Sequence, residues 1–243
     1  MNIVLMAAYN GEKYIRQQID SILEQIGKED LLMISLDPST DSTRTILEQY
    51  QQENPNIRIL NGPGKGVQKN FEHLLNEAHK IQKAAKADPE KTLIFLSDQD
   101  DIWYPDKISR CSEILDNEQA LLLVHNALMT DRNGNRTGSD YFSVHKTREG
   151  FIQNIVRNSF IGSCMVFRGS LLKDILPFAN PIPMHDQWIG LQACRKGKVV
   201  FSTESLIDYR RHESNATSMQ SSSLKQMLIW RAQIIRALLL RRI

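Results

Sequence analysis

Four short apolar runs in the first hundred residues constrain the fold of this chain most strongly. They cover residues 3–8, 31–36, 57–60 and 93–96, and a stretch with helical spacing of apolar residues separates each run from the next. Short apolar runs that alternate with amphipathic helices are typical of parallel strands joined by helical crossovers. The sequence therefore predicts an α/β fold with a parallel, doubly wound sheet in this half.

The intervening helices have recognisable ends. Apolar residues recur at helical spacing from Ile15 to Ile26, which predicts a first helix after residues 10–12 that ends at Gly27. A second helix is predicted after residues 39–41, where Ser, Thr and Asp supply capping groups. A third is predicted after Gly66.

After Pro105 the pattern becomes mixed, and a central sheet that is mostly but not purely parallel is expected. We expect one domain over residues 1–222, with halves at 1–104 and 105–222, followed by an amphipathic helix at 223–243. Further elements are predicted as strands at 121–129, 162–167, 199–202 and 206–210, a hairpin turn at 131–134 and a helix at 186–195.

Composition narrows the class of protein. Thirty basic and 28 acidic residues give a net charge of +2, which argues against a broad nucleic-acid-binding face. Three cysteines without a CxxC pair predict neither disulfides nor a zinc site, and fit a reducing cytosol. The chain has neither a signal-peptide pattern nor an 18-residue uncharged span, so we expect a cytoplasmic protein, soluble or peripheral at the inner face of the membrane.

The fourth apolar run leads directly into Ser-Asp-Gln-Asp-Asp at residues 97–101. Carboxylates gathered in one turn suit a hard cation such as Mg²⁺ or Mn²⁺, which prefers oxygen ligands and often carries a substrate phosphate. A solvated acidic turn before the helix near Pro105 explains the same residues. Residues alone leave both interpretations open.

The ends of three predicted parallel strands carry polar or aromatic residues, namely Tyr9 with Asn10, then Asp37, then Asp98 with Asp100. Ligands of open α/β sheets bind outside the carboxyl ends of the strands. We therefore expect these residues to line a common crevice. Asp186, at the start of a predicted helix, is a candidate general base, although local sequence alone favours an N-cap role.

Four motifs in this order resemble the inverting family-two glycosyltransferases, over about residues 1 to 215. They lie at residues 7–12, 37–43, 97–103 and 185–186. The form Ser-Asp-Gln-Asp-Asp-Ile-Trp at 97–103, with Tyr-Arg-Arg-His at 209–212, is most similar to bacterial rhamnosyltransferase-type members that build surface polysaccharides.

The resemblance implies a GT-A fold, a dTDP- or UDP-sugar donor, and Mn²⁺ or Mg²⁺. It implies that Asp98 and Asp100 form the metal motif, with Asp100 the direct ligand, and that His212 approaches the metal or diphosphate. Asp37 would accept the N3 hydrogen of the base and Tyr9 would pack on its ring. Asp186 would deprotonate a saccharide acceptor, and the expected reaction transfers rhamnose from dTDP-rhamnose with inversion.

Several weaker assignments complete the predicted site. A place in the hydrophobic core explains Trp188 as well as a ligand contact does. Residues 62–66 lack the spacing of a phosphate-binding P-loop and are predicted to form a turn. The remaining nucleotide contacts are assigned to Ala7, Glu12, Lys65 and Gln99. The acceptor or phosphate contacts are assigned to Gln187, Trp188, Gly162, Arg210 and Arg211.

Two alternatives stay open. Many relatives carry Asp-Asp-Gly-Ser where this chain has Leu36 to Ser39, and Pro38 deletes a backbone donor, which leaves room for a catalytically impaired nucleotide-sugar-binding partner subunit or for a different UDP-sugar. The basic amphipathic helix at 223–243 is predicted either to pack on the domain or a second copy, or to contact a membrane where lipid-linked acceptors reside.

Overall fold

The computed structural model describes residues 1–212 and 223–241. The predicted strands of the first half form β1 (Asn2–Ala8), β2 (Leu31–Leu36), β3 (Ile57–Asn61) and β4 (Leu93–Ser97). They pair in parallel in the order β3-β2-β1-β4, so their carboxyl ends share one edge of the sheet. The predicted doubly wound half is therefore present.

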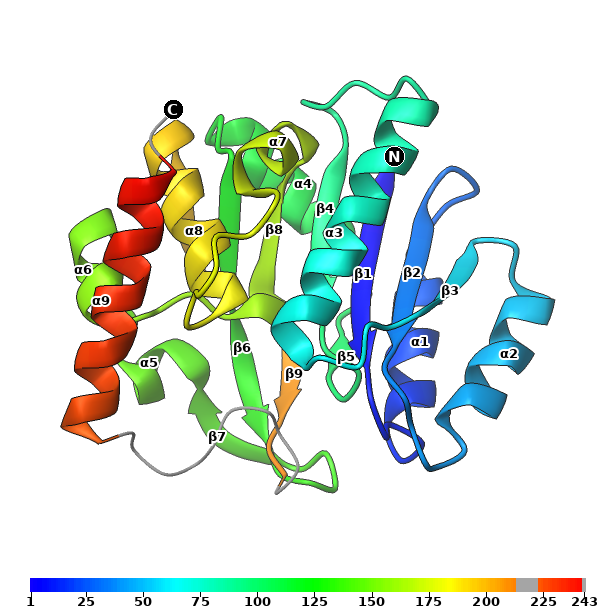
Figure 1. Ribbon diagram of the computed structural model, residues 1–243. Coiled ribbons are helices and arrows are strands. Elements are labelled where there is room, and N and C mark those ends of the chain that lie inside the picture. Colours follow the sequence, from blue (N-terminus) through cyan, green and yellow to red (C-terminus); the bar gives the residue numbers. More distant parts are fainter. Residues whose placement is uncertain (213–222, 242–243) are drawn as a thin grey trace.

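Helices α1 (Ile15–Leu23), α2 (Thr43–Glu53) and α3 (Val67–Ala84) connect these strands. The first helix ends at Leu23, earlier than the predicted Gly27, because Gly27 instead begins a turn in which its N–H donates to Asp30 Oδ2 at 2.9 Å. In Figure 1, α3 lies on the near face of the sheet and α1 on the far face.

The second half extends the same sheet with mixed pairing. Strand β8 (Met165–Arg168) runs antiparallel to β4 and to β6 (Leu122–Thr130), whereas β9 (Val199–Arg210) runs parallel to β6. The hairpin partner of β6 is β7 (Arg136–Asp140), as the turn at 131–134 predicted. Short β5 (Ile102–Trp103) pairs with β9, so one sheet runs through both predicted halves of the domain.

Two strand predictions were wrong in detail. Residues Gly162–Cys164 form a 3-10 turn and only Met165–Arg168 is strand. The two strands predicted at 199–202 and 206–210 are one strand, because irregularities in the register opposite Asn126 absorb the polar residues between them.

Helices cover the second half of the sheet and the end of the chain. Helix α8 begins at His185, one residue earlier than predicted, and α9 runs over Leu224–Leu240. Residues 213–222, which the domain prediction included, lie outside the described ranges. Helix α8 ends at Lys196. The other helical segments are α4 (Lys107–Asn117), α5 (Tyr141–His145), α6 (Phe151–Val156), η2 (Gly169–Leu171) and α7 (Leu172–Ile175).

Helix α9 packs on the domain through Ile234, Ala237 and Leu238, which are at most 8% exposed, and it contacts α6. Figure 1 shows it beside α6 and α8. The buried side chains confirm that part of this helix packs on the domain, as one of the two predictions stated.

Candidate active site

The strand ends of β1 and β4 are joined directly by the side chain of Gln99. Its Oε1 accepts from the Tyr9 N–H at 3.0 Å, and its Nε2 donates to the Tyr9 carbonyl at 2.8 Å. Gly11 permits this approach, since a Cβ there would lie 2.3 Å from Gln99 Oε1. Gln99, predicted to contact nucleotide, thus aligns the two strand ends that form the predicted crevice.

The acidic turn after β4 gathers three carboxylates. Asp98, Asp100 and Asp101 each offer an oxygen within 4.8 Å of the others, and Asp100 and Asp101 are buried. The Oδ2 atom of Asp101 is buried without a hydrogen-bond partner among the described residues. This all-oxygen donor set fits Mg²⁺ or Mn²⁺, and not a soft metal that requires thiolates.

The end of β9 and the residues after it contact the acidic turn. His212 Nε2 lies 2.7 Å from Asp100 Oδ2, so the predicted neighbourhood of His212 and Asp100 is present. The Arg210 backbone N–H donates to Asp101 Oδ1 at 3.1 Å, and its side-chain Nε donates to the Asp100 carbonyl at 2.9 Å. Strand β9 therefore holds the acidic turn in place from a distant part of the sequence.

Arg210 was predicted to contact phosphate, and its side chain lies against the acidic turn. Its side chain is buried, and Cζ of the guanidinium lies 4.6 Å from the centre of the Tyr14 ring. Its Nη2 donates to Gln17 Oε1 at 2.7 Å. Its guanidinium therefore supports the backbone of the acidic turn, and a phosphate contact of Arg210 stays a prediction.

A buried lysine lies beneath the acidic turn. Lys107 Nζ donates to the Ser163 carbonyl at 3.0 Å and sits 3.8 Å from the centre of the Trp103 ring. Burial lowers the pKa of Lys107 to about 8. Burial and the charges of Asp100 and Asp186 raise the pKa of Asp98 to about 7, whereas Lys107 opposes that rise. Lys107 was not predicted, because a lysine at a helix start carries no local signal of burial.

Asp37 lies directly after β2, where the sequence predicted contact with a nucleotide base. Its carboxylate is buried after β2 and accepts from the Gly64 N–H at 2.9 Å. A Cβ at Gly62 would lie 2.3 Å from Asp37 Oδ1, so the glycine-rich turn packs directly against this acid. The turn prediction for residues 62–66 is therefore confirmed, and Lys65 is exposed on it.

Three other predicted nucleotide residues lie on β1 or in the loop after it. Tyr9 is 56% exposed, which leaves its ring accessible to a base. Glu12 Oε2 accepts from the Ser42 N–H at 2.9 Å, so Glu12 holds the loop that follows Asp37. Ala7 is half-buried within β1, where it pairs with Ser35 of β2.

Asp186 lies in the first turn of α8 and is not its N-cap, which is Met184. Its Oδ1 accepts from the Gln187 N–H at 2.6 Å and from Asn158 Nδ2 at 3.2 Å. Burial raises the pKa of Asp186 to about 6. A carboxylate with this pKa is ionised at neutral pH and basic enough to remove a proton, which suits a general base.

A cavity of about 420 Å³ lies beside Asp186. Its walls come from the loop before α8 and from α5, α6 and α9. The residues that line it include Asp186, Tyr141, His145, Asn158, Met227 and Trp230. None of the last five was predicted, because they lie far apart in the sequence and meet only through helix packing.

Two predicted acceptor residues, Trp188 and Gln187, are buried in α8. Trp188 is 0% exposed and its Nε1 donates to the Ile175 carbonyl at 2.9 Å, so it is a core residue. Gln187 borders the cavity, but its Nε2 donates to the Asn154 carbonyl at 2.7 Å and it is 6% exposed. Both side chains anchor α8, and Gln187, which also borders the cavity, stays a predicted acceptor contact.

Two further predicted acceptor residues are Gly162, which packs against His185, and Arg211, whose charge acts on His145. A Cβ at Gly162 would lie 3.2 Å from His185 Nε2, so glycine lets the His185 ring pack between this turn and Phe71, whose ring centre is 4.3 Å away. The charge of Arg211 contributes, after burial, to the lowered pKa of His145. Arg211 is therefore close enough to act on groups that line the cavity.

Comparison with known proteins places this arrangement in context. A dTDP-rhamnosyl transferase of Shigella flexneri, RfbG, is 36% identical over 150 residues, covering 56% of this chain and 49% of RfbG. This chain thus spans about half the length of that relative. The structure of S. aureus TarS residues 1–349 with UDP-GlcNAc superposes with a TM-score of 0.68 at 20% identity, over 98% of this chain and 66% of that one.

A second solved structure carries a metal. Glucosyl-3-phosphoglycerate synthase of Mycobacterium tuberculosis, in complex with Mn²⁺, UDP and phosphoglyceric acid, superposes with a TM-score of 0.55 at 18% identity, over 99% of this chain and 78% of that one. These likenesses show the GT-A fold. Residues 3–176, more than half of the chain, match the family described as Glycosyl transferase family 2. The chain therefore belongs to glycosyl transferase family 2.

Proposed function

We propose that this protein transfers a sugar from a nucleotide diphosphate donor to a hydroxyl of a saccharide acceptor, with inversion at the anomeric carbon. The observation that carries the proposal is a turn with three carboxylates that lies near Asp186. Asp186 is close enough for its charge to contribute to the raised pKa of Asp98. In a family 2 chain, this arrangement would serve as a diphosphate site on one side and supply a base on the other.

The donor would lie along the strand ends. Asp37 would receive a base N–H, and Tyr9 would offer a ring face to the base, because both lie at the carboxyl edge of β1 and β2. Asp98, Asp100 and Asp101 would hold Mn²⁺ or Mg²⁺, and His212 lies where it can reach the same ion or the diphosphate. The bound cation supplies positive charge that stabilises the departing diphosphate.

The acceptor would enter the cavity beside Asp186. The Asp186 carboxylate, oriented by Asn158 and by the Gln187 N–H, would take the proton from the acceptor hydroxyl. That oxygen forms the new bond to the anomeric carbon while the bond from this carbon to the diphosphate oxygen breaks. One displacement on the opposite face inverts the configuration.

The donor sugar is proposed as L-rhamnose from dTDP-rhamnose, on the basis of the 36% identity to the dTDP-rhamnosyl transferase RfbG. A UDP-sugar is the alternative. We propose a polysaccharide or lipid-linked saccharide as acceptor, which would place the protein in the cytoplasm or at the inner face of the membrane. Its C-terminal helix would then meet the membrane or a second copy.

A donor screen tests the proposal. Purified protein with Mn²⁺ would be incubated with a panel of dTDP-, UDP- and GDP-sugars, and released nucleotide diphosphate measured over time. The proposal expects slow hydrolysis of one donor, fastest with dTDP-rhamnose, that EDTA abolishes. Nucleotide binding without hydrolysis of any donor would support a catalytically impaired partner subunit instead.

A further inference from the structure

The exposed apolar side chains of this molecule are concentrated on one face. Among the described residues, eleven large apolar side chains are exposed, and nine of them lie on α5, α6 and α9. On α9 these are 40–77% exposed. The nine form what we call the α5–α6–α9 face, and they are Val144, Ile152, Val156, Leu224, Leu228, Ile229, Ile235, Leu239 and Leu240.

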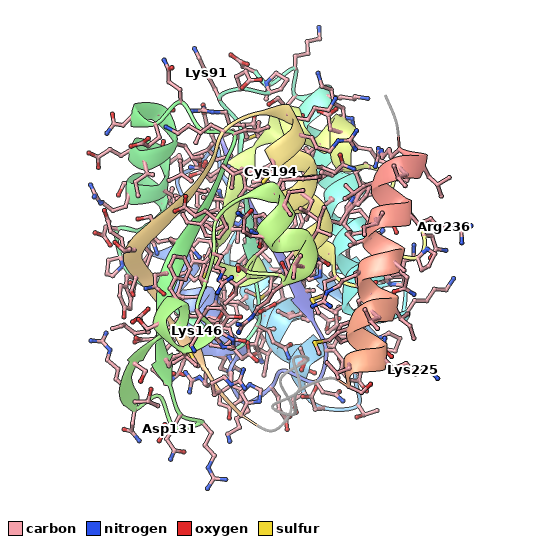
Figure 2. All side chains as sticks on the ribbon, turned by 90° about the vertical axis from the view of Figure 1, so that its left-hand side faces the viewer. Lys91, Asp131, Lys146, Cys194, Lys225 and Arg236 are labelled. Carbon is pink, nitrogen blue, oxygen red and sulfur yellow. The ribbon has the colours of Figure 1, made fainter. Side chains whose placement is uncertain are left out.

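The segments that carry this face are rich in basic residues. Residues 141–158 and 224–241 contain seven lysines and arginines but one acidic residue, Glu149, whereas the whole chain has a net charge of only +2. Figure 2 views this face, with α9 along one side and Lys146, Lys225 and Arg236 labelled. An apolar surface flanked by cations suits the headgroup region of an anionic bilayer.

A second copy of the chain fits this face less well. A two-fold dimer brings the same patch of each subunit together, so the basic side chains of one copy would meet those of the other. No helix among residues 1–212 and 223–241 is long and apolar enough to cross a membrane. The charge therefore favours a lipid surface on which the protein rests.

The face is continuous with the cavity beside Asp186. Met227, Trp230 and Arg231 of α9, with Val156 and Arg157 at the end of α6, line that cavity. Arg231 Nε donates to the Val156 carbonyl at 2.9 Å, which ties the two helices together at the cavity wall. A surface that binds lipid would therefore place the cavity next to the bilayer.

We propose that the α5–α6–α9 face docks on an anionic membrane and that the acceptor reaches Asp186 from that membrane as a lipid-carried saccharide. The docking stands on the exposed apolar side chains and their basic flanks, whereas the nature of the acceptor rests on the proposed function. Leu228 and Ile235 are the key apolar positions, since both are exposed and neither lines the cavity.

Co-sedimentation of the full chain with vesicles tests the docking. We expect binding to phosphatidylcholine vesicles that contain about 30% phosphatidylglycerol, weak binding to phosphatidylcholine alone, and loss of most binding at about 1 M salt. The variant Leu228→Glu/Ile235→Glu should reduce the bound fraction about tenfold, because it places charge where apolar side chains insert. Lys225→Glu/Arg236→Glu should also bind less.

Lys28→Glu/Lys83→Glu is the matched control, because it makes the same charge change on exposed residues of other elements and should bind normally. Equal sedimentation of all variants, or no binding by the unaltered protein, would overturn the docking. A dimer in sedimentation equilibrium that Leu228→Glu/Ile235→Glu dissociates, without vesicle binding, would assign the face to a second copy instead. Donor hydrolysis measured without vesicles reports separately on the proposed function.

Discussion

At the residue scale, the chemistry depends on two carboxylate environments that differ in kind. The Asp186 carboxylate accepts hydrogen bonds from the Gln187 N–H and the Asn158 side-chain amide, and burial raises its pKa. The carboxylates of Asp98, Asp100 and Asp101 instead lie close to one another. The first environment suits a single base and the second suits a cation. Substitutions of Asp186 should therefore impair a different step of the proposed reaction from substitutions in the three-carboxylate turn.

Asp186→Asn should leave donor binding intact and lower the transfer rate by about 10²- to 10⁴-fold, because the amide keeps the shape but cannot accept the acceptor proton. Calorimetry of donor binding and a steady-state transfer assay would measure the two effects. Asn158→Ala, which removes one hydrogen bond to Asp186, should give a smaller loss. Transfer by Asp186→Asn near the normal rate would move the base elsewhere.

The pH profile follows from the pKa of Asp186, which burial raises to about 6. A base must be ionised to act, so activity is retained above this pH and falls about tenfold per unit below it. An unperturbed aspartate would place the fall near about pH 4. Single-turnover rates at saturating donor and Mn²⁺ from pH 5 to pH 8 would locate it, and a flat profile down to pH 5 would contradict the assignment.

Asp100→Asn should abolish the part of nucleotide binding that depends on Mn²⁺, because it removes a charged oxygen from the three-carboxylate turn. Titration of dTDP with and without Mn²⁺ would show the loss. Asp116→Asn serves as control, since Asp116 pairs with Arg168 on the surface and belongs to no predicted site. Equal Mn²⁺ dependence in Asp100→Asn and the control would remove Asp100 from the metal site.

At the scale of elements, the site depends on how α8 and β9 are anchored. Helix α8 is held by the buried Trp188, whose indole donates to the Ile175 carbonyl, and β9 is held to the acidic turn by Arg210. Both anchors were predicted as ligand contacts, because an indole or a guanidinium beside a functional motif looks the same in sequence whether it faces a ligand or the core.

Trp188→Phe tests this distinction. It should destabilise the protein by about 1–3 kcal/mol, since the Ile175 carbonyl loses its buried donor, while the acceptor KM stays unchanged. Urea unfolding and transfer kinetics would measure both quantities. A rise in KM without loss of stability would restore Trp188 as an acceptor contact.

At the scale of the whole molecule, the proposed donor site needs the complete sheet. Its parts come from the ends of β1, β2 and β4 and from β9, which pairs with β6. A ligand that binds this assembled edge binds the folded state alone and so stabilises it. The folded state should therefore report donor binding through its thermal stability.

With dTDP and Mn²⁺ together at about 100 times the dissociation constant, the free energy of unfolding should rise by about 2.7 kcal/mol, and Tm by several degrees. Differential scanning calorimetry would measure the shift. Asp100→Asn should lose the Mn²⁺-dependent part of it. An unchanged Tm with a ligand that calorimetry shows to bind would mean that the site does not need the folded sheet.

The sequence by itself determined the alternation of strands and helices, the acidic turn after β4 and the motifs of the family. These follow from local periodicity and from residue types that stand next to one another in the chain, as for residues 97–101. The strand ends could therefore be placed at one edge before the structure was known.

Only the tertiary structure decided which side chains face the crevice. It buried Lys107, Trp188 and Arg210, and it formed the cavity beside Asp186 from α5, α6, α8 and α9. The physical reason is that burial and long-range contact depend on the register of β6, β8 and β9 and on helix packing, which couple residues that share no local pattern.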